Sequence, residues 1–190
     1  MSKRLSYVLR HDPASAGVHL DPGGWVAIAD LLRGLHRGGL PLTKGQLRDL
    51  VERSAKRRFA IDASGHRIRA NHGHSVDVDL GLTPAEPPDR LFHGTVGRSV
   101  PEILRMGLQA GSRQFVHLSD EIEAARTVGA RRGKPVVLDV RAARMFALGV
   151  ADFFRTVNGV WLVDHVPPEF VSIHETPPAP AEHAVPSPQH

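Results

Sequence analysis

The side chains most able to do chemistry in this sequence are arginines and histidines that gather in short phrases. Arg10 and His11 stand together in "VLRHDP", and further basic residues follow at Lys56, Arg57, Arg58, Arg67 and Arg69. The planar guanidinium fork binds phosphate oxygens through two parallel hydrogen bonds, so such a cluster suits a phosphorylated substrate or a nucleic-acid backbone. The alternative is a solvated basic face in which Arg10 and His11 only complement the negative end of a helix dipole. Composition alone favours this alternative.

Histidine also recurs beside small residues in two later phrases. In "RANHGHS", His72 and His74 are two residues apart, so a strand would direct both to one face. A metal site needs a third ligand, and none has an obvious spacing, so we predict no metal here and expect turn or substrate contacts. The phrase "FHGTV" places His93, Gly94 and Thr95 at a strand end, where the glycine would let a ligand approach the backbone.

The composition narrows the class of protein. The 190 residues include no cysteine, which excludes disulfides, thiol nucleophiles and cysteine-based zinc sites. The formal net charge of +4 and a sequence pI near 10.1 favour a polyanionic partner. The sequence shows no cationic start followed by an apolar h-region, and no apolar run of the roughly 20 residues that a membrane span needs. We therefore expect a cytoplasmic protein with no membrane partner, and by default a monomer.

Residues 1–80 are predicted to form three helices followed by a hairpin. Ser2 is the expected N-cap of a first helix that Pro13 ends. A second helix is predicted from Ile28, and a third after the N-cap Thr43. The alternation of apolar and polar residues in "RRFAIDASGHRIRA" predicts a β-hairpin with its turn at Ser64-Gly65. This order of elements is typical of a winged helix.

Residues 90–176 have the pattern of a mostly antiparallel α+β domain, in which short apolar strands alternate with two clear helices. The first helix is expected to have a capping box at Ser99 and Glu102 and to end at Gly107. The second is expected to begin at Ser119, just after His117 in the strand "FVHLS". The prolines of residues 81–89 predict a linker, and those of residues 177–190 a disordered tail.

Seven phrases, in one order, resemble the RNA 2′-phosphotransferase family. They run from about Ser2 to His174 and are "LSYVLRHDP", "KRRF", "IRANHGHS", "LFHGT", "SRQFVHLS", "VGARRGKPVVLDV" and "FFRTVNGVWL". Family members remove a splice-junction 2′-phosphate from tRNA with NAD as co-substrate. The resemblance implies an α+β fold with a winged-helix-like, RNA-binding lobe at residues 1–80 and an ADP-ribosyltransferase-like, NAD-binding lobe at residues 90–176.

The resemblance also implies which residues form the site. Matched motif by motif, the catalytic set is Arg10, His11, Arg58 and Arg113. The residues implied to meet the RNA phosphate are Arg10, His11, Arg58, Arg69 and His74. Those implied to contact NAD are His93, Gly94, Thr95, His117, Ser119, Gly129 and Arg131. The sequence departs from the family at His72, because members usually have Gln before the Gly-His pair.

The implied reaction has two steps. The RNA 2′-phosphate attacks the ribose C1″ of NAD and releases nicotinamide, and transesterification then gives RNA with a free 2′-hydroxyl and ADP-ribose 1″,2″-cyclic phosphate. Because a phosphate is already an anion at neutral pH, the first step needs cations and no general base, and "FFRTVNGVWL" holds no carboxylate. In the second step His11 is the expected general acid, since an unperturbed imidazole titrates near neutral pH.

Two other functions fit the same phrases. An ADP-ribosyltransferase that caps terminal phosphates of RNA or DNA would stop after the first step, so the phosphate would stay on the nucleic acid. A non-catalytic winged-helix nucleic-acid binder would keep the basic cluster without turnover of NAD. The matches at all four catalytic positions argue against the second alternative.

Overall fold

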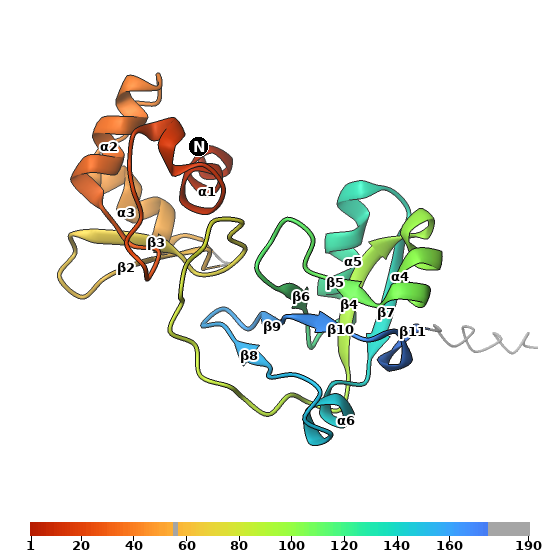
Figure 1. The fold of residues 1–190 in the computed structure, drawn as a ribbon. Helices are drawn as coiled ribbons and strands as arrows, with labels where there is room; N and C mark the ends of the chain where they lie inside the picture. Colours follow the sequence, from red (N-terminus) through yellow and green to blue (C-terminus); the bar gives the residue numbers. More distant parts are fainter. Residues whose placement is uncertain (55–56, 175–190) are drawn as a thin grey trace, which may run out of the picture.

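The computed structural model describes residues 1–54 and 57–174. Its secondary structure is mixed, with helices and four small sheets whose strands all pair antiparallel. The buried apolar side chains form two clusters, one drawn from residues 5–70 and the other from residues 91–171. The predicted α+β class is confirmed at this coarse level. Figure 1 shows the two sets of elements side by side, joined by the chain that follows β3.

The N-terminal part, residues 1–80, packs three α-helices against a three-stranded sheet of order β1-β3-β2. Its elements are α1 (Ser2–Arg10), η1 (Pro13–Ala16), β1 (Val26–Ala27), α2 (Ile28–Arg37), α3 (Lys44–Glu52), β2 (Phe59–Ile61) and β3 (Arg67–Ala70). The predicted order of three helices and a hairpin is confirmed. Helix α1 buries Leu5, Val8 and Leu9 because their spacing places them on one face.

Local sequence signals predicted the starts of α2 and α3 correctly but not that of α1. Thr43 caps α3 through a capping box with Gln46, in which each side chain bonds the other residue's backbone N–H. Gly65 makes the hairpin turn with φ of 69°, a conformation that glycine adopts without strain. The predicted N-cap at Ser2 is wrong: the cap is Met1, and Ser2 is the first helical residue. Pro13 begins η1, which follows two residues after α1 ends.

The C-terminal part, residues 90–174, contains three further sheets, of orders β11-β7-β4, β6-β9-β8 and β10-β5. Its elements are β4 (Leu91–Val96), η2 (Gly97–Ser99), α4 (Val100–Met106), β5 (Leu108–Gln109), β6 (Val116–Leu118), α5 (Ile122–Gly129), η3 (Ala130–Arg132), β7 (Pro135–Val140), α6 (Ala142–Ala147), β8 (Phe154–Arg155), β9 (Trp161–Val163), β10 (His165–Val166), η4 (Pro168–Phe170) and β11 (Val171–Ile173). Helix α5 packs on β4 and β7.

Two predictions about the helices of this part are wrong, and one helix was not predicted. Ser99 is the N-cap of α4, but its side chain makes no capping hydrogen bond, so the predicted capping box is not formed. Ser119 does not begin a helix, because its backbone pairs with Phe92 and joins β6 to β4. Its hydroxyl accepts a hydrogen bond from Glu121 N–H, and α5 starts at Ile122. Helix α6 has six residues, too few for its periodicity to be recognised.

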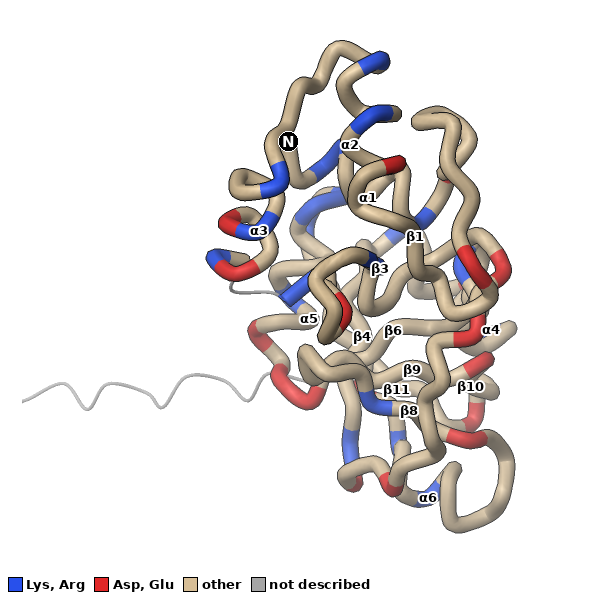
Figure 2. The backbone as a smooth tube through the Cα atoms, turned by 90° about the vertical axis from the view of Figure 1, so that its left-hand side faces the viewer, with Lys and Arg blue, Asp and Glu red and all other residues tan. Residues whose placement is uncertain are grey.

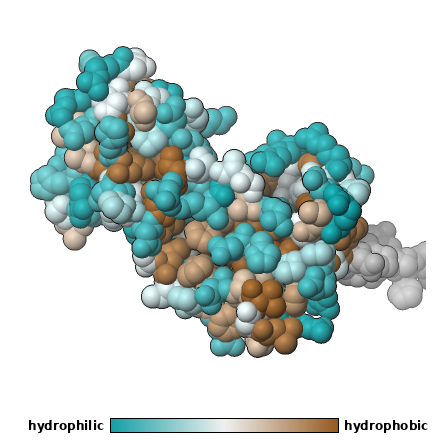
Figure 3. All heavy atoms as spheres, viewed as in Figure 1, coloured by the Kyte–Doolittle hydropathy of each residue, from teal (hydrophilic) through white to brown (hydrophobic). Residues whose placement is uncertain are grey.

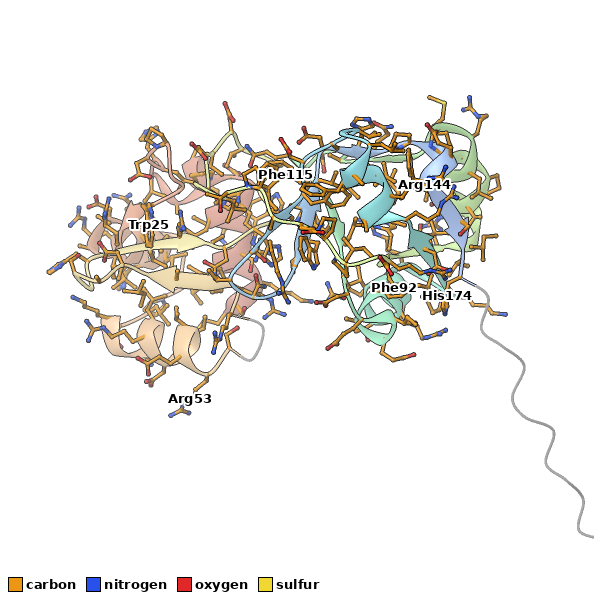
Figure 4. All side chains as sticks on the ribbon, turned by 90° about the horizontal axis from the view of Figure 1, so that it is seen from below. Trp25, Arg53, Phe92, Phe115, Arg144 and His174 are labelled. Carbon is orange, nitrogen blue, oxygen red and sulfur yellow. The ribbon has the colours of Figure 1, made fainter. Side chains whose placement is uncertain are left out.

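The end of the C-terminal part is held by one buried carboxylate. Asp139 of β7 is 6% exposed, accepts a hydrogen bond from His174 Nδ1 at 3.1 Å, and lies 3.4 Å from Arg90 Nη1. The ring of His174 meets the ring of Phe92 edge to face, with centroids 5.6 Å apart, and Figure 4 shows the two side by side. These contacts fix the outer strand β11 of the sheet.

The chain between the two parts contacts the C-terminal part. The backbone of Pro84 pairs with that of Phe154, and Ala85 N–H donates to the Phe153 carbonyl at 2.8 Å. The predicted tail at residues 177–190 lies outside the described residues. Figure 3 shows a mainly polar surface on the N-terminal helices and an apolar patch over α6, where Leu148 is 63% exposed. No helix within the described ranges has the length and hydropathy to cross a membrane.

Candidate functional site

Residues 71–75, here called the connecting segment, contact both parts of the molecule. Ser75 N–H donates to the Arg10 carbonyl at 2.9 Å, and the His74 carbonyl accepts from Gln114 N–H at 3.1 Å. Gly73, with φ of 86°, lies against the side chain of Arg10, since a Cβ there would be 3.5 Å from Arg10 Nη1. This segment therefore brings the end of α1 next to the loop that holds Arg113. In Figure 4, Phe115 of this loop lies where the two parts meet.

Arg10, the last residue of α1, supplies the most unusual cation of the molecule. Its Nε and Nη2 atoms are buried and have no hydrogen-bond partner among the described residues. Its guanidinium lies 6.0 Å from the centre of the Phe59 ring. Burial, followed by the positive charges of Arg113 and Arg58, lowers the pKa of Arg10 to about 10. Guanidinium groups from three separate segments of the chain, the end of α1, the residue before β2 and the loop between β5 and β6, thus act on one another, and an anion would stabilise all of them.

His11 follows Arg10 and faces the same cations. Its Nδ1 is joined to Ser75 Oγ by a hydrogen bond of 2.9 Å. Burial, followed by the charges of Arg10 and Arg113, holds the pKa of His11 below its usual value of 6.5. The imidazole is therefore mostly neutral at pH 7 in the free protein. A bound phosphate would raise this pKa, because a nearby negative charge favours the protonated ring.

Arg58 enters from the hairpin. It is half-buried just before β2, and its carbonyl accepts a hydrogen bond from Asn71 N–H at 3.0 Å. The neighbouring Arg57 is exposed. Lys56, which the sequence also placed in the basic cluster, lies outside the described residues. The hairpin and α1 together provide the N-terminal share of the cation cluster.

Arg113 provides the C-terminal share. Burial lowers its pKa, and the charges of Arg132 and Arg131 lower it further. Arg131 was among the residues implied by the resemblance, whereas Arg132 was not. The effect of Arg132 on the pKa of Arg113 is the larger of the two. The consecutive arginines in "ARRGK" were the available signal, but sequence alone could not tell which of them faces the other cations.

The histidines next to these cations are neutral. The rings of His72 and His117 are 5.3 Å apart, and burial is the main cause that lowers the pKa of His72 to about 2 and that of His117 to about 4. His72 Nε2 accepts a hydrogen bond from Asn158 Nδ2 at 3.1 Å. His93 Nδ1 donates to the His117 carbonyl at 3.1 Å, and burial also lowers the pKa of His93. His117 Nε2 is buried without a partner among the described residues.

His74 is the most deeply buried of the residues implied to meet the RNA phosphate, and Arg69 is half-buried. The His74 ring is 2% exposed, and burial, together with the charges of Arg10, His11 and Arg69, lowers its pKa to about 4. Arg69 lies 4.7 Å from the centre of the Trp25 ring, and its Nη1 donates to the backbone carbonyls of Gly23 and Leu80. His74 therefore lies close enough to Arg10, His11 and Arg69 to feel their charges, and both His74 and Arg69 lie beside the cation cluster.

The glycines of the C-terminal candidate set have a packing role. A Cβ added at Gly94 would overlap the Ala125 carbonyl of α5, and one added at Gly129 would lie 2.6 Å from the Thr95 carbonyl. The sequence suggested that Gly94 lets a ligand approach the backbone; in the structure, the backbone of α5 occupies that side. Thr95 is 9% exposed in this contact. The close packing fixes η3, which carries Arg131 and Arg132, against β4.

Charge is unevenly divided along the chain. Residues 1–80 contain 13 Lys and Arg and 8 Asp and Glu, whereas residues 81–190 contain 11 and 12. The net positive charge of the protein therefore comes from the N-terminal part, whose basic residues appear in blue in Figure 2. Within residues 1–54 and 57–174, no three His, Cys, Asp or Glu side chains gather as metal ligands would.

Comparisons with known proteins give a consistent result. The model of the family described as "RNA 2′-phosphotransferase, Tpt1 / KptA family" matches residues 1–165. A Nostoc punctiforme protein named "Probable RNA 2′-phosphotransferase" is 51% identical over 171 residues, covering 90% of this chain and 94% of its own length. Proteins of the same name from Agrobacterium fabrum and Streptomyces griseus are 52% and 47% identical, with 90% of this chain covered in each case and 92% and 94% of theirs.

Proposed function

Because the chain belongs to the RNA 2′-phosphotransferase, Tpt1/KptA family and is thus a transferase for RNA 2′-phosphates, we propose that NAD is its co-substrate. We further propose that the reaction takes place at the cation cluster beside the connecting segment. The catalytic residues in this proposal are Arg10, His11, Arg58 and Arg113.

The observation that carries the proposal is the electrostatic state of Arg10. A buried guanidinium with unpartnered donors, facing two further arginines, is costly unless an anion binds there. A phosphate supplies several acceptor oxygens and two negative charges, so it relieves both the missing hydrogen bonds and the repulsion. Among the described residues, no ion pair to a carboxylate offsets these charges.

The neighbouring residues fit a dinucleotide. When bound, NAD supplies an electrophilic ribose carbon and nicotinamide as the group that leaves it. Arg131 and Arg132 provide cations for a pyrophosphate, and the unpartnered Nε2 of His117 provides a buried acceptor. The other residues that we propose to contact NAD are His93, Gly94, Thr95, Ser119 and Gly129 on β4, after β6 and at the end of α5.

The protein side chains have different tasks in the reaction. Arg58 and Arg113 hold the RNA phosphate and stabilise the negative charge that builds on phosphorus. His11 is neutral in the free protein and becomes protonated once the phosphate is beside it, so it can donate a proton to the departing RNA 2′-oxygen. The first step requires no general base, because the attacking phosphate is already an anion, and this agrees with the absence of a carboxylate from residues 153–163.

The proposal includes a division of labour between the two parts. Residues 1–80 form a winged-helix-like lobe that binds RNA, and their excess of basic residues supports this assignment. Residues 90–176 form an ADP-ribosyltransferase-like lobe that binds NAD, with residues 81–89 as the linker. The protein acts in the cytoplasm as a monomer.

The test is a product analysis. The protein is incubated with NAD and a short RNA that carries one internal 2′-phosphate, and nicotinamide and RNA are resolved. We expect equal amounts of nicotinamide and of RNA with a free 2′-hydroxyl, and no nicotinamide from the matched RNA without the phosphate. RNA that keeps its phosphate while nicotinamide is absent would contradict the proposal. A parallel RNA with only a 5′-phosphate distinguishes terminal capping, because its phosphate would gain ADP-ribose and stay on the RNA.

A further inference from the structure

The backbone just before Arg58 has an unusual conformation. Arg57 has φ of 38°, and it is the single non-glycine residue with a positive φ among those that the structure describes. A side chain with a Cβ is disfavoured in this left-handed region, so surrounding contacts must hold it there. Arg57 is exposed and immediately precedes a proposed catalytic residue. The contacts that fix the backbone of Arg57 also set the direction in which the side chain of Arg58 points.

Asn71 is the residue that makes these contacts. Its side chain, 8% exposed, donates from Nδ2 to the Arg57 carbonyl at 2.5 Å. Its backbone N–H donates to the Arg58 carbonyl at 3.0 Å. The first bond continues past the end of the β2–β3 ladder, in which Phe59 pairs with Ala70, and reaches the residue with the left-handed backbone. Asn71 therefore holds both peptide groups that flank the Cα of Arg58.

We propose that Asn71 is a positioning residue, which aims Arg58 at the RNA phosphate by holding the backbone of Arg57 and Arg58. This inference rests on the proposed function of the cation cluster. Asn71 is also the first residue of the connecting segment, whose Gly73 and Ser75 contact Arg10 and His11. One short segment thus fixes the relative positions of cations that come from α1 and from the hairpin.

The first experiment measures steady-state kinetics of Asn71→Ala with NAD and the internally 2′-phosphorylated RNA. We expect kcat to fall about 10- to 100-fold, since a small misplacement of a catalytic group has an effect of this size. The KM for NAD should stay at its wild-type value, because Asn71 contacts the Arg58 side of the site. Thermal unfolding is recorded in parallel. If Asn71→Ala does not fold, Asn71→Ser, which leaves a smaller gap and is too short to reach the Arg57 carbonyl, takes its place.

A second-site test separates positioning from a general loss of structure. Glycine adopts a positive φ freely, so Arg57→Gly should make the Asn71 side chain less necessary. We expect Asn71→Ala to cost at least several-fold less kcat in the Arg57→Gly background than in the wild type. Arg57→Ala keeps the Cβ and should give no such relief, which controls for the loss of the Arg57 charge. Equal losses in all three backgrounds would overturn the proposal.

Further variants test whether Asn71 acts through Arg58 and whether the proposed function itself holds. In an Arg58→Ala background, Asn71→Ala should cause no further loss of kcat, and an additional full loss would contradict the proposal. Asp139→Asn, which alters a buried polar group that contacts Arg90 and His174, is the control for destabilisation alone and should leave kcat unchanged. If the wild-type protein itself releases no nicotinamide, the proposed function fails. If the wild type is active and Asn71→Ala equals it, only the role of Asn71 fails.

Discussion

Two regions of this molecule differ in how completely their buried atoms are packed and hydrogen-bonded. Where α5 crosses β4, Gly94 and Gly129 let one backbone touch another, and the contact leaves no room for a single additional carbon. Around the connecting segment, Arg10 and His117 keep buried polar atoms that no described residue satisfies. The first region is complete in itself. In the second, a bound anion would accept the hydrogen bonds that Arg10 can donate, and a donor group on a ligand would satisfy the acceptor Nε2 of His117.

Because of this difference, we expect substitutions in the first region to lower stability and substitutions in the second to lower activity. Filling space at the β4–α5 contact should lower the stability of the protein. Removing a cation beside the connecting segment should damage activity while leaving stability intact, because these like charges repel one another and are partly desolvated. The following predictions test this contrast, beginning with the largest effect.

The largest effect is expected for Arg58→Ala. Removing one of the groups that stabilise charge in the transition state should lower the turnover of NAD with 2′-phosphorylated RNA about 100- to 1,000-fold. The melting temperature should stay the same or rise slightly, since one repulsive contact with Arg10 is removed. Nicotinamide release and thermal unfolding measure the two quantities.

Arg53→Ala is the matched control for Arg58→Ala. Arg53 is exposed at the end of α3, and Figure 4 shows its side chain pointing away from the protein. Its removal should leave turnover unchanged. Wild-type turnover in Arg58→Ala, or an equal loss in Arg53→Ala, would remove the distinction between the cluster and an ordinary basic face.

The next effect is a loss of stability in Gly94→Ala. The new Cβ would overlap the Ala125 carbonyl, and backbone atoms cannot move aside as a side chain could. We expect a loss of about 3 kcal/mol in the free energy of unfolding, at the upper end of the usual cost of overpacking. Gly97→Ala is the control, because no atom lies within 4 Å of its Cβ position. Equal denaturant midpoints for the two variants would show that the β4–α5 contact is not tight.

The features that were predicted correctly from the sequence depend on residues that are close together along the chain. The Thr43 cap, the turn at Gly65 and the apolar face of α1 each follow from residues within a few positions of one another. Ser119 is an example of a residue for which local prediction fails. Its residue type is typical of an N-cap, but its backbone pairs with that of Phe92, 27 positions away along the chain, and is therefore extended. Long-range pairing decided that conformation, and no local pattern records it.

The candidate site divides in the same way. The identities of Arg10, His11, Arg58 and Arg113 came from matched phrases, and the structure brings their charges within reach of one another. Their individual roles stay predictions. The supporting residues were not predicted. Asn71 contacts Arg57 through a hydrogen bond between residues 14 positions apart. Arg131 and Arg132 are neighbours of the same residue type, and the sequence does not show which of the two acts more strongly on Arg113. Tertiary geometry sets these roles.

A step-specific effect is expected for His11→Ala. If His11 donates the proton to the departing RNA oxygen, its loss should slow the second step about 100-fold and the first step much less. RNA that carries ADP-ribose on its 2′-phosphate should then accumulate, and rapid quenching followed by mass analysis detects it. Arg58→Ala is the internal comparison, because that cation acts in both steps. Equal slowing of both steps by His11→Ala would refute its role as an acid.

The smallest effect concerns stability and pH. The folded-state pKa is lowered to about 2 for His72 and to about 4 for His74 and His117, against 6.5 for the unfolded chain. Between pH 6.5 and pH 4 the unfolded chain therefore binds more protons, so the free energy of unfolding falls as the pH falls, by about 1 kcal/mol per pH unit for each histidine. His72→Gln, which introduces the usual family residue, should reduce this slope by one histidine's share while leaving stability above pH 7 nearly unchanged. Denaturant unfolding at a series of pH values measures the slope, and Gly97→Ala should retain it in full. An identical slope in His72→Gln would mean that His72 is protonated in the folded protein, and that burial at the connecting segment does not hold its ring neutral.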